Sequence, residues 1–156
     1  MKLRILSPGN RMPVWVNAGY EDYARRFVAP YSLTLNALPA EKRTPTADIK
    51  KITEREGKKM LASLQSGHRI IALDERGELW STQKLASILK EWSSMAPGID
   101  FLIGGTDGLS KECLDRAHCR WSLSPLTLPH PLVRILLAEQ LYRATALLRN
   151  HPYHRD

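Results

Sequence analysis

Residues 99–108 read Ile-Asp-Phe-Leu-Ile-Gly-Gly-Thr-Asp-Gly, a short apolar run followed directly by a glycine-rich turn. The run predicts a buried strand over 99–103. A second run, Ile70-Ile71-Ala72-Leu73, is apolar at consecutive positions and predicts a central strand that is covered on both faces. Such runs alternate with amphipathic helical patterns along the chain. This alternation predicts an α/β fold in which helices sandwich a mostly parallel sheet.

The other elements follow from turn residues and hydrophobic spacing. Strands are expected over 3–6, 32–38, 69–73, 99–103 and 120–123, with 74–78 as the turn after the third. Helices are expected over 13–27, 46–64, 82–96, 111–117 and 132–148, where Ser81 and Ser110 are candidate N-caps. The first helix is expected to bury a stripe formed by Trp15, Ala18, Gly19, Tyr23 and Phe27. The last is so apolar that it should be buried on more than one side, as core and as a subunit interface.

Length and composition limit the class of protein. The 156 residues are enough for one domain, 1–156, and Lys plus Arg outnumber Asp plus Glu by 23 to 16. A polyanionic partner such as RNA is therefore as plausible as a basic protein that binds no nucleic acid. Cys113 and Cys119 have a spacing that fits neither a zinc motif nor a redox pair, so no metal is expected. Because no secretory or membrane-spanning segment is visible, we expect a cytoplasmic protein without membrane contact.

Two segments after predicted strands are candidates for ligand binding. The turn 104–108 should lie at the carboxyl edge of the sheet, where open α/β folds bind ligands, although it matches neither the dinucleotide fingerprint nor a P-loop and could be a plain tight turn. Residues 123–131, Leu-Ser-Pro-Leu-Thr-Leu-Pro-His-Pro, predict an ordered, extended loop whose apolar walls would suit an adenine ring. The alternative is a rigid connector to the last helix.

A third candidate is the C-terminal tail, residues 151–156, which holds two imidazoles, a phenol and a guanidinium. Histidine exchanges protons near neutral pH and arginine binds phosphate, but chain ends are also commonly frayed. His130, between two prolines, is either functional or a packing residue. No Ser-His-Asp order, metal-ligand cluster or close carboxylate pair is visible, which favours group transfer by positioning over hydrolysis.

Taken together, the chain resembles the large-subunit ribosomal RNA methyltransferase H family, which belongs to the SPOUT class. The resemblance covers the whole chain and rests on Ile103-Gly104-Gly105 with Gly108-Leu109, on the run from Trp121 to Arg134, on 138–144 (Ala-Glu-Gln-Leu-Tyr-Arg-Ala) and on 150–154 (Asn-His-Pro-Tyr-His). Two departures are visible. Thr106-Asp107 stands where a Pro-Glu pair is common, and Ser7-Pro8 alters the usual apolar end of the first strand.

The resemblance implies a homodimer that transfers a methyl group from S-adenosyl-L-methionine to N3 of a pseudouridine in 23S rRNA, within the assembled 70S ribosome. It also implies a C-terminal trefoil knot, with knot and cofactor site over about 100–156. The cofactor would be lined by Leu73, Gly104, Gly105, Leu123, Ser124, Pro125, Leu126, Thr127 and Leu128. The RNA base would face His130, Tyr153, His154 and Arg155, with the tail of one subunit completing the site of the other.

Further expectations concern the chemistry and its alternatives. His154 or a water molecule is the expected acceptor of the N3 proton. Arg143, Arg155 and the loop at Lys42-Arg43 are expected to contact phosphates. The competing hypothesis is a non-catalytic ribosome- or RNA-binding protein, in which turn and loop are only structural. A nucleotide-binding oxidoreductase is disfavoured because the fingerprint and its acidic ribose ligand are missing.

Overall fold

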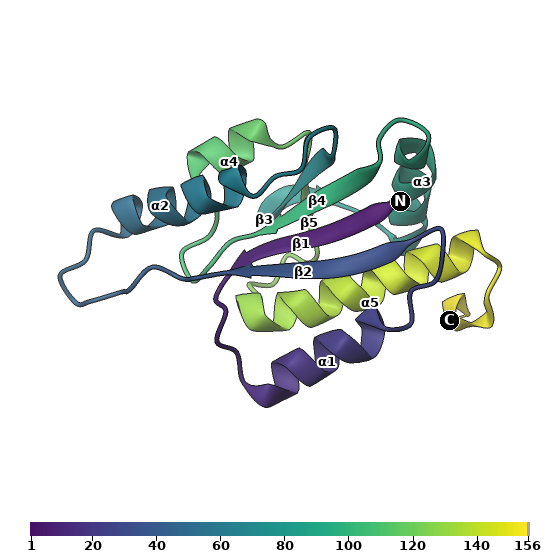
Figure 1. Cartoon of the computed structure of the whole chain (residues 1–156), viewed down its shortest axis with the longest axis horizontal. Coiled ribbons are helices and arrows are strands. Elements are labelled where there is room, and N and C mark those ends of the chain that lie inside the picture. The colour runs from purple at the N-terminus through teal and green to yellow at the C-terminus, as the bar shows by residue number, and fades with distance from the viewer. Residues whose placement is uncertain (156) are drawn as a thin grey trace.

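The computed structural model describes residues 1–155, without the side chain of His154. Its centre is a five-stranded sheet (Figure 1). The strands are β1 (Lys2–Pro8), β2 (Ser32–Leu38), β3 (Arg69–Leu79), β4 (Gly98–Ile103) and β5 (Cys119–Ser122), in the order β2-β1-β4-β3-β5. All neighbouring pairs are parallel, with Leu3 opposite Ile99 and Ile71 opposite Phe101. The predicted α/β fold is confirmed, and the sheet is entirely parallel.

Across the described residues 1–155, five α-helices and one 3₁₀ turn surround this sheet. They are α1 (Val14–Ala24), α2 (Ile49–Ala62), α3 (Thr82–Ser93), α4 (Lys111–Arg116), α5 (His130–Leu148) and η1 (Pro152–His154). Ser81 and Ser110 are N-caps as predicted, because their side chains accept hydrogen bonds from the third backbone N–H of α3 and α4. Asp48 caps α2 in the same way. The helix ends lie within a few residues of the predicted ones.

The helices form two layers, one on each face of the sheet (Figure 1). Leu3 and Ile5 of β1 are fully buried beneath the layer made by α1, α3 and α5, whereas Leu6 packs with Met60 of α2 and Cys113 of α4. This alternation is the two-residue period of a strand that is covered on both faces. The helix α5 contacts both α1 and α3, which confirms that it is buried on more than one side.

One local prediction is partly wrong and another is wrong. Of the stripe predicted on α1, Tyr23 and Phe27 pack against the core, but Ala18 is exposed and Trp15 is 59% exposed, because the fully buried residues of α1 are Val16 and Tyr20. Residues 74–78 are not the turn that ends β3. The strand continues to Leu79, and both Leu73 and Glu78 pair with Trp121, so the residues between them form a large bulge. Gly77 permits this bulge, since a Cβ there would lie 2.7 Å from the backbone of Arg120.

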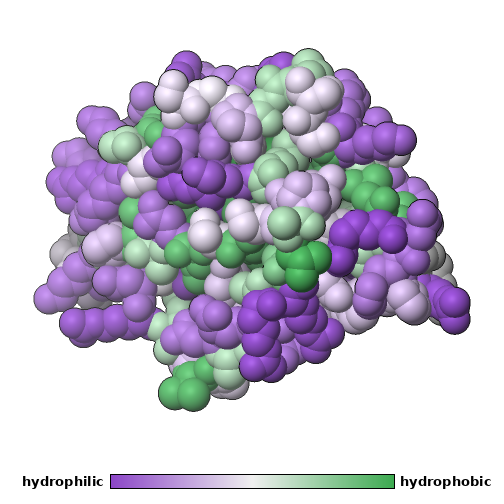
Figure 2. All heavy atoms as spheres, turned by 45° about the vertical axis from the view of Figure 1, so that its right-hand side comes forward, coloured by the Kyte–Doolittle hydropathy of each residue, from purple (hydrophilic) through white to green (hydrophobic). Residues whose placement is uncertain are grey.

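The surface is mixed in character. Hydrophilic side chains dominate the face shown in Figure 2, where smaller apolar areas interrupt them. Within residues 1–155, none of the helices combines the length and apolar character needed to cross a bilayer. Over the same residues, no group of three or more His, Cys, Asp or Glu side chains is arranged to hold a metal ion. Both cysteines are free thiols, and burial raises the pKa of each.

Candidate functional site

A pocket of about 950 Å³ lies at the carboxyl ends of β3, β4 and β5. Three segments line it: the bulge of β3, the glycine turn after β4, and the proline loop 123–131 after β5. The predicted cofactor residues in its wall are Leu73, Gly104, Gly105, Leu123, Ser124, Leu126, Thr127 and Leu128, and His130 lies there too. Pro125 is the one predicted cofactor residue that does not line it. The structure therefore brings the turn and the loop together at one sheet edge, as expected from parallel strands.

The glycine turn has a backbone geometry that requires glycine at two positions. Gly108 has φ +81°, and its N–H donates to the carbonyl of Gly105 at 3.1 Å. A Cβ on Gly104 would lie 2.4 Å from the carbonyl carbon of Gly108, so even alanine would force the turn apart. Thr106 and Asp107 occupy the exposed tip. The departure from the family pattern at these positions therefore leaves the backbone cradle intact.

The proline loop is ordered by its own hydrogen bonds. The hydroxyl of Ser122 donates to the carbonyl of Ser124 at 2.9 Å, and the hydroxyl of Ser124 accepts from the N–H of Leu126 at 3.0 Å. Thr127 donates to Glu75 of the β3 bulge at 3.1 Å, which ties two walls of the pocket to each other. Leu126 remains 72% exposed although it is apolar. These contacts order the loop and fix it to the bulge of β3.

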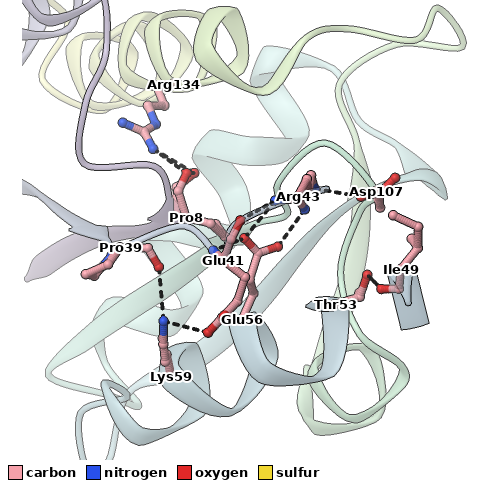
Figure 3. A network of polar contacts seen from close by, with 11 residues as sticks. Pro8, Pro39, Glu41, Arg43, Ile49, Thr53, Glu56, Lys59, Asp107 and Arg134 are labelled. Carbon is pink, nitrogen blue, oxygen red and sulfur yellow. Dashed lines mark hydrogen bonds and ion pairs between the residues drawn. The ribbon is translucent and has the colours of Figure 1, made fainter. Parts of the chain in front are cut away.

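The N-terminal turn of α5 holds a cation without an acidic partner. Arg134 is 1% exposed, and its Nη2 donates to the carbonyls of Pro8 and Gly9, both at 2.7 Å, and to the hydroxyl of Ser7 at 3.2 Å (Figure 3). Within residues 1–155 no carboxylate forms an ion pair with it, and burial lowers the pKa of its guanidinium. The unusual Ser7-Pro8 end of β1 is therefore part of the polar cradle of Arg134.

His130 lies one turn of helix before Arg134, in the pocket wall. Burial, and then the positive charges of Arg134 and Arg43, lower the pKa of His130 below its ordinary value of 6.5. Its Nδ1 is buried and has no hydrogen-bond partner among the described residues. The imidazole is consequently neutral at pH 7 and keeps a lone pair that can accept a proton or a hydrogen bond.

A polar network closes the other side of the glycine turn (Figure 3). Arg43 donates to Glu56 of α2 and to Asp107 at the tip of the turn, each at 2.9 Å. Glu56 is 4% exposed and also accepts from the N–H of Glu41. Its hydrogen bond to Arg43 raises the pKa of that guanidinium. Arg43, which was expected to contact phosphates, is thus already paired, and it holds the loop 39–45 against α2 and the glycine turn.

The C-terminal tail lies far from the pocket of its own chain. The helix α5 has 19 residues, and at 1.5 Å per residue it spans about 28 Å. His130 is its first residue, whereas η1 follows its far end, opposite the arrowhead of β1 in Figure 1. The hydroxyl of Tyr153 donates to Glu139 at 3.2 Å. Of the three candidate segments, the structure brings together two, the turn 104–108 and the loop 123–131, within a single chain.

The remaining tail residues have separate outcomes. Burial, and then the charge of Glu139, raise the pKa of Tyr153 to about 12, so its phenol stays protonated. Arg143, another expected phosphate ligand, pairs with Glu139 and lies 4.8 Å from the centre of the Tyr153 ring. Arg155 is exposed. The side chain of His154, the expected proton acceptor, lies outside the described part of the structure.

Sequence reasoning missed several residues of the pocket. Glu75 and Arg76 reach its wall only because 74–78 form a bulge, and Arg120 lies beside them. A pattern of strands and turns offers no signal for such a bulge, apart from Gly77. The role of Arg134 could have been noticed as the one strong cation in the first two turns of a very apolar helix.

A fully parallel sheet with a pocket at its carboxyl edge, bounded by a glycine turn, is the arrangement in which open α/β proteins bind ligands. A family model described as "Predicted SPOUT methyltransferase" matches residues 1–154. The chain therefore belongs to the SPOUT methyltransferase family. Membership makes it a methyltransferase rather than an oxidoreductase, and it implies S-adenosyl-L-methionine as methyl donor and a knotted C-terminal region.

Proposed function

We propose that this protein methylates N3 of a pseudouridine in 23S rRNA of the assembled ribosome, as a homodimer that uses S-adenosyl-L-methionine. The observation that carries the proposal is the pocket itself, because the predicted cofactor residues of the glycine turn and the proline loop meet there. The net charge of +7 supports an RNA substrate. The trefoil knot and the organisation of 1–156 as one catalytic domain remain predictions of the same resemblance.

The residues of the pocket fit the methyl donor. Leu123, Leu126 and Leu128 offer apolar walls for an adenine ring, and the glycine turn allows backbone groups to approach a ligand closely. Asp74 and Glu75 at the rim can accept hydrogen bonds from hydroxyl or ammonium groups of the ligand. When bound, S-adenosyl-L-methionine would supply an electrophilic methyl group on a positively charged sulfur.

The chemistry requires positioning and the removal of one proton. The bond between N3 and the methyl carbon forms as the bond from that carbon to sulfur breaks, and the N3 proton goes to an acceptor. Holding both reactants in line can contribute about 7 to 11 kcal/mol. His154 or a water molecule remains the proposed acceptor. His130, which is neutral and lines the pocket, is proposed to contact the base and is available as an alternative acceptor.

The position of the tail supports a dimer in which each site is shared. Tyr153 and Arg155 follow the end of α5 that lies about 28 Å from the pocket end. An antiparallel pairing of two α5 helices about a twofold axis would bring each tail to the pocket end of the other chain. Exposed apolar side chains lie near that end, namely Val14 and Trp15 on α1 and Leu136 on α5. Burying them would stabilise such a pairing.

Calorimetric titration with S-adenosyl-L-methionine, combined with methyl transfer to ribosomes that lack the modification, tests the proposal. Gly104→Val should abolish cofactor binding, because its side chain would collide with the backbone of Gly108. Thr44→Val, at an exposed position outside the pocket, is the control and should bind normally. Transfer to N3 of pseudouridine by the wild type supports the proposal. Ribosome binding without cofactor binding would favour the non-catalytic alternative.

A further inference from the structure

The exposed side of α2 carries a concentration of positive charge that the fold does not require. Lys50, Lys51, Arg55 and Lys58 are all exposed, and together they are called the basic face of α2 below. At 100° per residue these four side chains fall within one side of the helix, opposite the buried Ile52, Glu56 and Met60. Glu54 is the one acidic residue of α2 on this side.

The basic face gathers several exposed cations without acidic partners on one helix. Some exposed cations elsewhere are paired: Arg25 and Arg26 pair with Asp22, and Lys111 pairs with Asp115. On α2 itself, Lys59 pairs with Glu41. Across residues 1–155, none of the four cations of the basic face forms an ion pair within 4.0 Å. Among the nearby acids, Asp48 caps the helix and Glu41 is bound to Lys59, whereas Glu54 and Glu112 are exposed beside Lys50 and Lys58.

Two like-charged pairs also lie on this side of α2, and Glu54, four residues from both Lys50 and Lys58, offsets part of their repulsion. Lys51 and Arg55 are four residues apart and Arg55 and Lys58 are three apart, which are the spacings at which like charges on a helix repel each other. A binding partner with many negative charges would remove this repulsion. Along the helix axis, Lys51 to Lys58 spans about 10 Å, which corresponds to about three nucleotides at 3.4 Å per nucleotide of one strand.

The basic face begins beside the pocket. Glu56, on the opposite side of α2, is tied through Arg43 to Asp107 at the tip of the glycine turn. Lys50 and Thr53, from the first turns of α2, line a surface pocket together with Leu109 and Ser110, which follow the glycine turn. Gly57 packs against Ser110, directly after the glycine turn. A polyanion that extends from a base at the pocket could therefore pass over α2 without leaving the protein.

We propose that the basic face of α2 binds backbone phosphates of the ribosomal RNA next to the methylated nucleotide. This inference rests on the proposed function for the identity of its partner. It assigns to α2 the phosphate contacts that were expected from Arg43 and Arg143, both of which are held by carboxylates of the same chain. The contacts would be electrostatic and independent of base sequence.

The test compares two double variants by the salt dependence of binding. Lys51→Gln/Lys58→Gln removes two cations of the basic face, and Lys84→Gln/Lys90→Gln removes two exposed lysines from α3 on the opposite face of the sheet. Fluorescently labelled protein is titrated with 70S ribosomes lacking the modification at several salt concentrations. The α2 variant should reduce the slope of log affinity against log salt by about 1.4 to 1.8, and the α3 variant should leave it unchanged.

Two results would overturn the inference: an unchanged slope for the α2 variant, or an equal reduction for the α3 variant, which would show an effect of net charge alone. Failure of the proposed function has a different signature. Suppose that the wild type binds ribosomes and that only the α2 variant shows a reduced slope of log affinity against log salt, but that no methyl group is transferred. The RNA-binding surface then stands and the assigned reaction is wrong. If the α2 variant loses binding to polyglutamate as strongly as it loses binding to ribosomes, an acidic protein is the better partner and the RNA assignment is overturned.

Discussion

Replacing Arg134 with methionine tests the structural importance of the buried cation. The change keeps an unbranched side chain but removes the donor that holds the carbonyls of Pro8 and Gly9 at 2.7 Å. Hydrogen bonds that involve a charged group contribute about 1.5–3 kcal/mol each, so the two carbonyls set a range of about 3 to 6 kcal/mol. Burying an unpaired cation is itself costly, and removing that cost offsets part of the loss. We expect the free energy of unfolding to fall by about 3 kcal/mol.

Urea unfolding followed by circular dichroism measures this change, and the melting temperature should fall by roughly 6 to 12 °C. Ser7→Ala is the matched control. Nη2 has two hydrogens, which the two nearer carbonyls accept, so the hydroxyl of Ser7 at 3.2 Å is a third, weaker acceptor. Its loss should cost less than about 1 kcal/mol. An Arg134→Met variant as stable as the wild type, or a Ser7→Ala variant that is equally destabilised, would refute this reasoning.

Three further outcomes are expected. Burial and the charge of Arg134 lower the pKa of His130 in the folded state, so the unfolded state binds a proton first as the pH falls. The free energy of unfolding should therefore decrease as the pH drops below 6.5. Between about pH 7.5 and pH 5, urea unfolding should show a smaller decrease for His130→Gln than for the wild type. Arg43→Gln leaves the carboxylate of Glu56 without its cation and should lower the free energy of unfolding by about 2 kcal/mol. The loss is smaller than for a fully buried ion pair because Arg43 is 25% exposed. In chemical denaturation, the double variant Arg43→Gln/Glu56→Gln should recover part of that loss. Mixing inactive Gly104→Val chains with inactive Arg155→Ala chains should restore about a quarter of the wild-type methyl transfer. Random pairing makes half of the dimers mixed, and each mixed dimer has one complete site out of two. No recovery of methyl transfer would mean that the tail acts on the pocket of its own chain.

The parts of the fold that were predictable from sequence are those specified by neighbouring residues. Ser81 and Ser110 were recognisable as caps because a short hydroxyl side chain preceded a helical pattern, and both accept the expected hydrogen bond. The run 99–103 was recognisable as a buried strand because no polar alternation interrupts it except Asp100. These signals are local, and the parallel sheet follows from them because strands alternate with helices.

The errors occur where a distant part of the chain decides the outcome. Trp15 fits a helical apolar stripe, yet the part of α1 that is fully buried carries Val16 and Tyr20, which lie outside that stripe. Residues 74–78 have the composition of a turn, but pairing with Trp121 on both sides of them keeps β3 in the sheet. In neither case does the local sequence identify the neighbouring element, so spacing alone could not give the correct answer.

The candidate site shows the same division at a larger scale. The turn 104–108 and the loop 123–131 both follow strands of one parallel sheet, so the sheet edge brings them together, and the sequence was sufficient to expect this. The tail also carries reactive side chains, but a helix of about 28 Å separates it from the pocket of its own chain. The residues of the tail alone do not predict this separation. If Tyr153 and Arg155 act on the bound base, the helix that keeps them away from their own pocket is what makes a second chain necessary. The length of α5 would then be a determinant of dimerisation as well as of the fold.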